Sequence, residues 1–320
     1  ATIYAEALMA QKYKQVGADG IVTGGPVYYI RAAFNNVFGK VLAGIFAVLL
    51  IFALGFMGNA VQSNSIASSF NTAFGIPQWI MGLIVAVLAL FIFSGGMKRI
   101  AKVTETMVPL MAALYIIGSL IVIIYNWRNI PLAFYEIFVG AFAPSSIAGG
   151  AVGATIKLAL TKGVARGLFS NEAGSGSAPC AAAAAEVSHP VKQGLIQALG
   201  VFIDTLVICS CSAFLMLLAP AEKIEGLMGM DLLQAAMNHH LGYAGVVFIA
   251  VVLFLFSFST FLGILYYARC NVSYVFGDTW KAQTGYKIFL LIMLFIGGVA
   301  AYEFVWELGD LGVGLMTVFN

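Results

Sequence analysis

Long apolar runs recur along the whole chain, and short polar connections separate them. An α-helix needs roughly 20 apolar residues to cross about 30 Å of hydrocarbon. The pattern therefore predicts an all-α integral membrane protein with several membrane-spanning helices. The complete spans lie at about Val41–Ser63, Ile76–Met97, Met107–Tyr125, Gly194–Ala219, Leu241–Ala268 and Tyr286–Ala301, and a seventh begins near Phe304.

Four other segments carry signals of their own. Ser145–Phe169 is long enough to cross, yet it opens with small residues and holds three basic residues in its second half, which predicts a broken helix. We expect interfacial helices in the connections Asn126–Pro144 and Pro220–Gly242. The alanine run Ala181–Ala185 suits a short cytoplasmic helix.

Composition and charge agree with membrane embedding. The chain is 61% hydrophobic and 9% charged, whereas a soluble domain is about 25% charged. The net charge of +2 does not suggest a nucleic-acid partner. Of the 16 Lys and Arg residues, all but Arg128 and Lys223 fall in alternate connections, which should therefore face the cytoplasm. We predict a multi-pass protein of the plasma or inner membrane, with the lipid bilayer as a partner.

Several polar groups lie at membrane depth. Gly149, Gly150 and Gly153 could break a helix so that its free backbone groups bind a solute, or could serve close helix packing. Asn59 and Gln62 are candidate substrate contacts, and their alternative is interhelical hydrogen bonding. Two further sets also have a structural alternative, which is favoured for Ser259 and Thr260. Asp204 and Thr205 lie on an ion pathway or bond within the bundle, and Ser259 and Thr260 bind a cation or bond back to their own helix.

Other chemistries find little support. The four cysteines have no zinc-type spacing and are interpreted as small core residues. The chain shows no nucleophile–base pair, so we expect no enzyme, and no repeated polar filter of a channel. The first residue is Ala1 and the last, Asn320, ends an apolar run. We therefore expect a single transporter domain over residues 1–320 that is truncated at both ends.

Motifs along essentially the whole chain resemble the alanine/glycine:cation symporter family. They are Tyr4-Ala-Glu6, Gly24-Gly-Pro-Val-Tyr-Tyr-Ile30, Gly58-Asn-Ala-Val-Gln-Ser-Asn-Ser-Ile-Ala67, Gly163-Val-Ala-Arg-Gly-Leu-Phe-Ser-Asn-Glu-Ala-Gly-Ser-Gly-Ser-Ala-Pro179, His189-Pro-Val-Lys-Gln-Gly194, Gly200-Val-Phe-Ile-Asp-Thr205 and Val305-Trp-Glu-Leu-Gly-Asp310. The motif that ends at Pro179 is the most specific of them. The resemblance implies sodium-driven uptake of alanine or glycine, with sodium as the coupling ion and no organic cofactor.

The resemblance also implies a fold and a site. The fold is the LeuT-like five-plus-five inverted-repeat bundle, here without the first helix, most of the second and the end of the tenth. Asn59 and Gln62 would lie beside the substrate on the third helix, and Gly149, Gly150 and Ala151 would form the break of the sixth. Ser259 and Thr260 on the eighth would bind sodium.

Some expectations stay open at this stage. The family often has an aromatic residue where this chain has Ala151, which leaves the substrate's size open. Residues Arg166–Glu172 and the Ser177 region would lie on the cytoplasmic side, where capping and loop structure are favoured over a gate. Proton coupling and a non-functional fragment are the alternatives, and the oligomeric state stays open.

Overall fold

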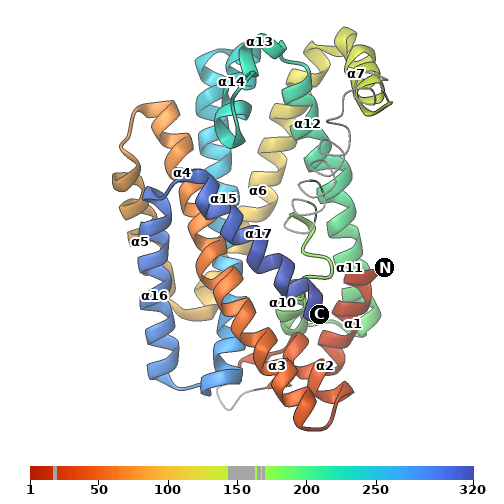
Figure 1. Ribbon diagram of the computed structural model, residues 1–320, viewed down its shortest axis with the longest axis vertical. Coiled ribbons are helices and arrows are strands. Elements are labelled where there is room, and N and C mark those ends of the chain that lie inside the picture. Colours follow the sequence, from red (N-terminus) through yellow and green to blue (C-terminus); the bar gives the residue numbers. More distant parts are fainter. Residues whose placement is uncertain (17–19, 143–162, 164–166, 168–169) are drawn as a thin grey trace, which may run out of the picture.

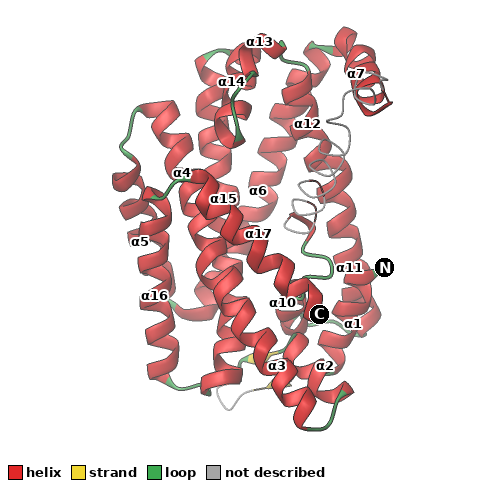
Figure 2. Ribbon diagram, viewed as in Figure 1, coloured by secondary structure: helices red, strands yellow, loops and turns green. Residues whose placement is uncertain are grey.

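The computed structural model describes residues 1–16, 20–142, 163, 167 and 170–320, and nearly all of this part is helical (Figures 1 and 2). The elements are α1 Thr2–Lys12, β1 Gln15–Val16, β2 Val22–Thr23, α2 Pro26–Ala33, α3 Val37–Leu50, η1 Ile51–Gly58, α4 Asn59–Phe74, α5 Gln78–Ser94, α6 Gly96–Tyr125, η2 Trp127–Asn129, α7 Ile130–Phe142, α10 Ala178–Ala184, α11 Pro190–Ile203, η3 Asp204–Ile208, α12 Cys209–Leu217, α13 Ala221–Ile224, α14 Gly229–Leu241, α15 Tyr243–Phe276, α16 Trp280–Val299 and α17 Tyr302–Phe319. The two short strands pair antiparallel, with Val16 opposite Val22. The prediction of an all-α membrane protein is confirmed.

Five helical stretches of the described chain are long and apolar enough to cross a membrane. They are Val37–Phe74, Arg99–Tyr125, Pro190–Leu217, Tyr243–Phe276 and Trp280–Val299. The remaining predicted span, Ile76–Met97, corresponds to the shorter apolar helix α5. The helix α17 begins two residues before Phe304, where the seventh span was predicted to start. Of the weaker signals, α7, α13 and α14 lie in the two connections expected to hold interfacial helices, and α10 covers the alanine run.

Two helices run well beyond their predicted ends. The helix that was expected to stop at Ser63 continues as α4 to Phe74, and α15 continues past Ala268 to Phe276. Hydropathy marks only the lipid-facing length, whereas the polar extensions are helical because they are buried against neighbouring helices. Arg269 and Asn271 in the α15 extension, for example, are both buried.

The main core lies where the helices α3, α4, α5, α15, α16 and α17 meet. Two of these helices, α4 and α16, approach closely at Gly297 on α16, where an added Cβ would lie 2.4 Å from the Cα atom of Ala60 on α4. Nearby, the Asn64 amide donates to the carbonyls of Gly297 and Ala300, at 3.1 and 2.7 Å. This bond pair satisfies carbonyls at the end of α16 that have no partner within the helix.

The bundle has two distinct ends (Figure 1). The helices α1, α2 and α10 lie at the lower end in that view, with the α15–α16 connection, whereas α7, α13 and α14 lie at the upper end. Among the described connections, the basic ones around α1 and α2 and between α15 and α16 lie at the lower end, and the acidic one with α13 and α14 lies at the upper end. Which end faces the cytoplasm stays a prediction.

Two spans contain π-helical segments that the apolar pattern did not predict. The segment η1 separates α3 from α4, and η3 separates α11 from α12. A π segment shifts the i→i−4 ladder and leaves carbonyls in need of other donors, and such segments occur frequently at functional sites. The candidate residues Asn59 and Asp204–Thr205 lie directly at these two segments.

Candidate functional site

A small cavity lies between the π segment η1, α4, α15 and α17, and we call it the central cavity. Its volume is about 220 Å³, which is enough for several water molecules. Its described lining residues are Leu54, Gln62, Ser170, Glu172, Ser175, Ser177, Thr260, Ile264 and Val313. Six of these nine have polar side chains, and every one of the six offers oxygen, so the cavity suits a polar solute or a hard cation.

The segment just before α10 forms the most polar wall of this cavity. Glu172 has φ +52°, and Gly174 and Gly176 have φ +93° and +83°, so the chain turns sharply here. The Ser175 amide and hydroxyl both donate to the Glu172 carbonyl, at 3.2 and 2.8 Å. The Ser177 hydroxyl donates to the Glu172 carboxylate, Oγ to Oε2, at 2.8 Å. These bonds fix the carboxylate at the cavity wall.

A second buried carboxylate anchors the same turn from outside the cavity. Glu6 on α1 is 2% exposed, and its Oε2 accepts from the Gly174 amide at 3.0 Å. The Asn320 amide donates to the Gly174 carbonyl at 2.9 Å and also to Glu6. The turn is therefore tied to α1 and to the end of α17, which limits how far Glu172 can move.

Glu172 lies outside the candidate membrane spans, and its side chain is partly buried at the cavity wall. Burial raises the pKa of Glu172 to about 6, and the hydrogen bond from Ser177 opposes this rise. The carboxyl group can therefore change its charge near physiological pH. Sequence reasoning assigned this region to capping and loop structure. Ser177 does occupy the N-cap position of α10, but its hydroxyl bonds Glu172 rather than the helix backbone.

The two predicted sodium-binding hydroxyls point to different places. Thr260 lines the central cavity, and its Oγ1 donates to the Phe256 carbonyl at 2.9 Å, which leaves oxygen lone pairs free for a cation. Ser259 bonds the same carbonyl at 2.9 Å but faces Met111 on α6, with Oγ 3.3 Å from the sulfur. Back-bonding, the alternative drawn from the sequence, thus occurs at both, and the sodium role of the pair stays a prediction.

The two predicted substrate contacts on α4 also separate. Gln62 lines the cavity, and its amide makes no hydrogen bond to the described part of the chain. Asn59 is fully buried and donates to the carbonyls of Leu54 and Gly55, at 3.3 and 2.8 Å. Asn59 therefore pairs carbonyls within η1, while Gln62 is available to a solute.

Asp204 and Thr205 lie next to the polar wall rather than on the cavity itself. Ser170, a lining residue, donates to the Asp204 carboxylate at 3.0 Å. Thr205 donates to the Asn171 side chain at 2.9 Å and to its own helix at Val201, 2.8 Å away. The pair thus contacts the segment that leads into the Glu172 turn. The predicted sixth-helix break at Gly149, Gly150 and Ala151 lies outside the described residues.

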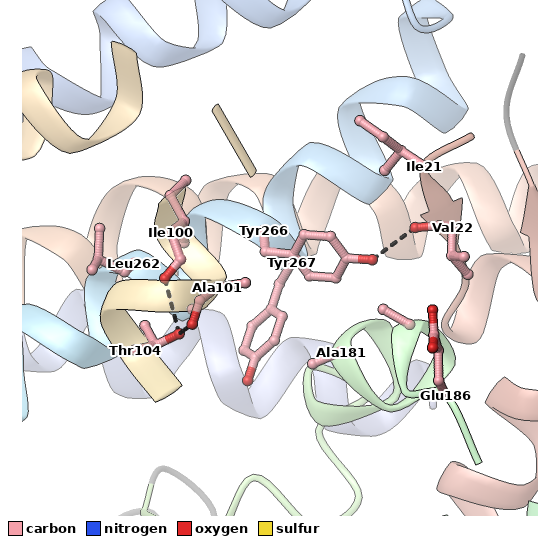
Figure 3. Close-up of a pocket in the computed structure, with 12 residues that line it drawn as sticks. Ile21, Val22, Ile100, Ala101, Thr104, Ala181, Glu186, Leu262, Tyr266 and Tyr267 are labelled. Carbon is pink, nitrogen blue, oxygen red and sulfur yellow. Dashed lines mark hydrogen bonds between the residues drawn. The ribbon is translucent and has the colours of Figure 1, made fainter. Parts of the chain in front are cut away.

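A larger and more open cavity, of about 520 Å³, lies closer to the basic end of the bundle, and we call it the vestibule (Figure 3). It lies between the strand β2, the start of α6, α10 and the second half of α15. Its described lining residues are Ile21, Val22, Ile100, Ala101, Thr104, Ala181, Ala184, Glu186, Leu262, Gly263, Tyr266 and Tyr267. The sequence did not predict this space, because its lining residues come from four separate parts of the chain.

Comparison with known proteins relates the whole chain to one group of transporters. The model of the sodium:alanine symporter family matches residues 1–320. The GlnT protein of Bacillus subtilis, named as a probable sodium/glutamine symporter, is 43% identical over the full chain, which covers 65% of GlnT. The AlsT amino-acid carrier protein of the same organism is 39% identical, with 66% covered.

An archaeal relative is named for alanine. The sodium/alanine symporter AgcS of Methanococcus maripaludis is 36% identical over the full chain, which covers 70% of AgcS. The chain spans about two thirds of the length of these curated relatives. They are named as symporters or carriers and not as enzymes. The match along every residue of the chain and these relatives agree, and the chain belongs to the sodium:alanine symporter family.

Proposed function

We propose that the protein carrying this chain is a secondary active transporter that brings a small neutral amino acid, alanine or glycine, into the cell together with sodium. The central cavity is the observation that carries this proposal. It is small, its polar lining groups all offer oxygen, and it lies about midway along α15, at Thr260. A transporter needs such a solvated space between its helices at membrane depth.

Within the cavity we assign different tasks to different groups. Thr260 and Glu172 offer oxygens to sodium, which as a hard cation prefers oxygen ligands. The Gln62 amide, which makes no hydrogen bond to the described residues, has both a donor and an acceptor, so it suits the carboxylate and ammonium groups of an amino acid. Leu54, Ile264 and Val313 supply the apolar part of the wall, against which a short side chain packs.

We further propose that the helices follow the LeuT-like five-plus-five arrangement. In that arrangement α4 belongs to the third helix, α15 is the eighth and α17 is the tenth. The meeting of these three helices at one cavity supports the assignment. Disulfide cross-linking of cysteine pairs placed between α4 and α15 and between α4 and α17 of a full-length protein would test it.

Transport itself is tested with the full-length protein in proteoliposomes. An inward sodium gradient should drive uptake of radiolabelled alanine, unlabelled glycine should compete, and choline in place of sodium should abolish the uptake. Glutamine is included as a competitor because GlnT is named for it. Uptake without sodium, or a preference for glutamine over alanine, would contradict the proposal.

Proton coupling is the second candidate, and one observation favours it. Because burial raises the pKa of Glu172 to about 6, this carboxyl group could exchange a proton during transport. YrbD of Bacillus subtilis, 40% identical to this chain, carries a provisional name as a sodium/proton-dependent alanine carrier. A proton ionophore in the uptake assay separates the two, since it abolishes proton-driven uptake and spares sodium-driven uptake.

A further inference from the structure

The helices α15 and α10, the latter with its N-cap Ser177, contribute lining residues to both the central cavity and the vestibule. Along α15, Thr260 and Ile264 line the central cavity and Tyr267 lines the vestibule. Along α10, Ser177 lines the central cavity, and Ala181 and Ala184 line the vestibule. Steps of four and then three residues keep each set on one helix face. Two facing stripes therefore lead from one cavity to the other.

The two cavities are nevertheless separate in this structure. Among the described residues, they share no lining side chain. The largest side chain on either stripe is Tyr267, and the side chains of the facing stripe on α10 are small: a serine and two alanines. The position of the Tyr267 ring therefore decides whether the stripes enclose one continuous space or two.

The ring of Tyr267 lies back along α15, toward the central cavity. A Cβ added at Gly263 would meet the Tyr267 hydroxyl at 3.8 Å, so the ring lies over the helical turn before its own Cα. Figure 3 shows the ring projecting between Thr104 on α6 and Ala181 on α10. Tyr266 points the other way, toward β2, and its hydroxyl donates to the Val22 carbonyl at 2.7 Å.

Gly263 leaves space beside the Tyr267 hydroxyl, because an added Cβ there would make only ordinary van der Waals contact. No bulky side chain at that position therefore holds the ring against its own helix.

We propose that Tyr267 is the gate between the central cavity and the vestibule, and that its ring must move for a solute to pass toward the basic end. The inference rests on the proposed function, since it takes the central cavity as the solute's site. Tyr267 is a positioning residue: it sets access to the site without binding the solute.

A cysteine-accessibility experiment on the full-length protein tests the gate. The native cysteines are replaced by alanine, and Ile264→Cys is the reporter, because Ile264 lines the central cavity one turn from Tyr267. A membrane-impermeant thiol reagent is added to inside-out vesicles, without substrate. Labelling rates are then compared for the reporter alone and with Tyr267→Ala, Tyr267→Phe or the matched control Tyr266→Ala.

Tyr267→Ala should raise the labelling rate about tenfold, which corresponds to a barrier lower by about 1.4 kcal/mol. Tyr267→Phe keeps the ring and should raise it clearly less, and Tyr266→Ala should leave it nearly unchanged. An unchanged rate in Tyr267→Ala, or an equal rise in Tyr266→Ala, would overturn the gate. Tyr267→Leu repeats the measurement if the alanine variant aggregates.

The outcome is independent of the transport assay. Labelling needs no gradient and no substrate, so a gate can be found even in a protein that fails to take up alanine. Conversely, normal sodium-driven uptake together with an unchanged labelling rate in Tyr267→Ala would reject the gate and leave the proposed function intact.

Discussion

Replacing Thr260 by alanine should weaken sodium coupling without unfolding the protein. The Thr260 side chain is partly buried on the wall of the central cavity, and its hydroxyl bonds only its own helix at Phe256. Loss of that local bond costs about 1 kcal/mol. Alanine is the better helix former by roughly half a kcal/mol, which offsets part of the loss. Folding and surface expression should therefore be nearly normal.

The effect on sodium should be much larger than the effect on stability. A contact between an oxygen and a charged group contributes about 1.5–3 kcal/mol. Since each 1.4 kcal/mol is a factor of about ten in a binding constant, the half-saturating sodium concentration should rise about tenfold to a hundredfold. The assay is alanine uptake into proteoliposomes over a sodium series at fixed membrane potential.

Ser259→Ala is the matched control for this experiment. Both variants remove one hydroxyl that bonds the Phe256 carbonyl, at neighbouring positions of the same helix. The Ser259 hydroxyl faces Met111 instead of the central cavity, so its loss should leave the half-saturating sodium concentration nearly unchanged. Equal effects of the two variants, or no effect of Thr260→Ala, would show that Thr260 is a packed helix residue and not a ligand.

Two further predictions concern the carboxylate and the packing. Because burial raises the pKa of Glu172 to about 6, the group is charged above that pH and neutral below it. Sodium affinity should therefore fall as the pH drops through 6, and Glu172→Gln should show weak sodium affinity at every pH. If sodium affinity changes with pH in the same way in the unaltered protein and in Glu172→Gln, the prediction is wrong. Gly297→Ala places a Cβ 2.4 Å from the Cα of Ala60 and should cost about 1–3 kcal/mol, seen as a lower Tm in detergent. Gly285→Ala on the same helix meets nothing within 4 Å and should not lower the Tm; equal Tm values for the two variants would show that the helices can separate freely.

The sequence was a good guide to the helices because membrane spans follow from a simple physical requirement. Every backbone polar group in hydrocarbon must be satisfied, so a long apolar run is almost necessarily helical. This is why an apolar helix lies at each predicted span, and why the start of α17 and the short helix α10 were predicted within a few residues. The requirement ends where the chain leaves lipid or is covered by protein, so the polar ends of α4 and α15 were predicted too short.

The candidate site was only partly predictable, since a helix face depends on the local winding. Gln62 and Thr260 were chosen as polar groups at membrane depth, and both reach the central cavity. Asn59 was chosen on the same grounds, but the π segment η1 turns its amide to the carbonyls of Leu54 and Gly55. A π segment adds one residue to a turn without a distinct apolar pattern, so the sequence did not reveal it.

Glu172 was missed for a related reason. An acid in a stretch rich in glycine and serine suggests an exposed loop when only the sequence is considered. The useful signal was the three small residues Gly174, Ser175 and Gly176 directly after it, which allow a turn with positive φ. What places this turn inside the protein is its attachment to Glu6 and Asn320, over 150 residues away on one side and over 140 on the other.

The departures from regular helix and the polar cavity have one physical origin. Irregular backbone at membrane depth is stable only where protein or water satisfies its polar groups. Here η1 and the Glu172 turn border the central cavity, and η3 contacts the turn through Ser170. A rigid regular bundle would have no such space, because side chains of neighbouring helices would fill it. The same irregular segments that open room for a solute also place the Glu172 carboxylate on the wall of the cavity that Thr260 lines.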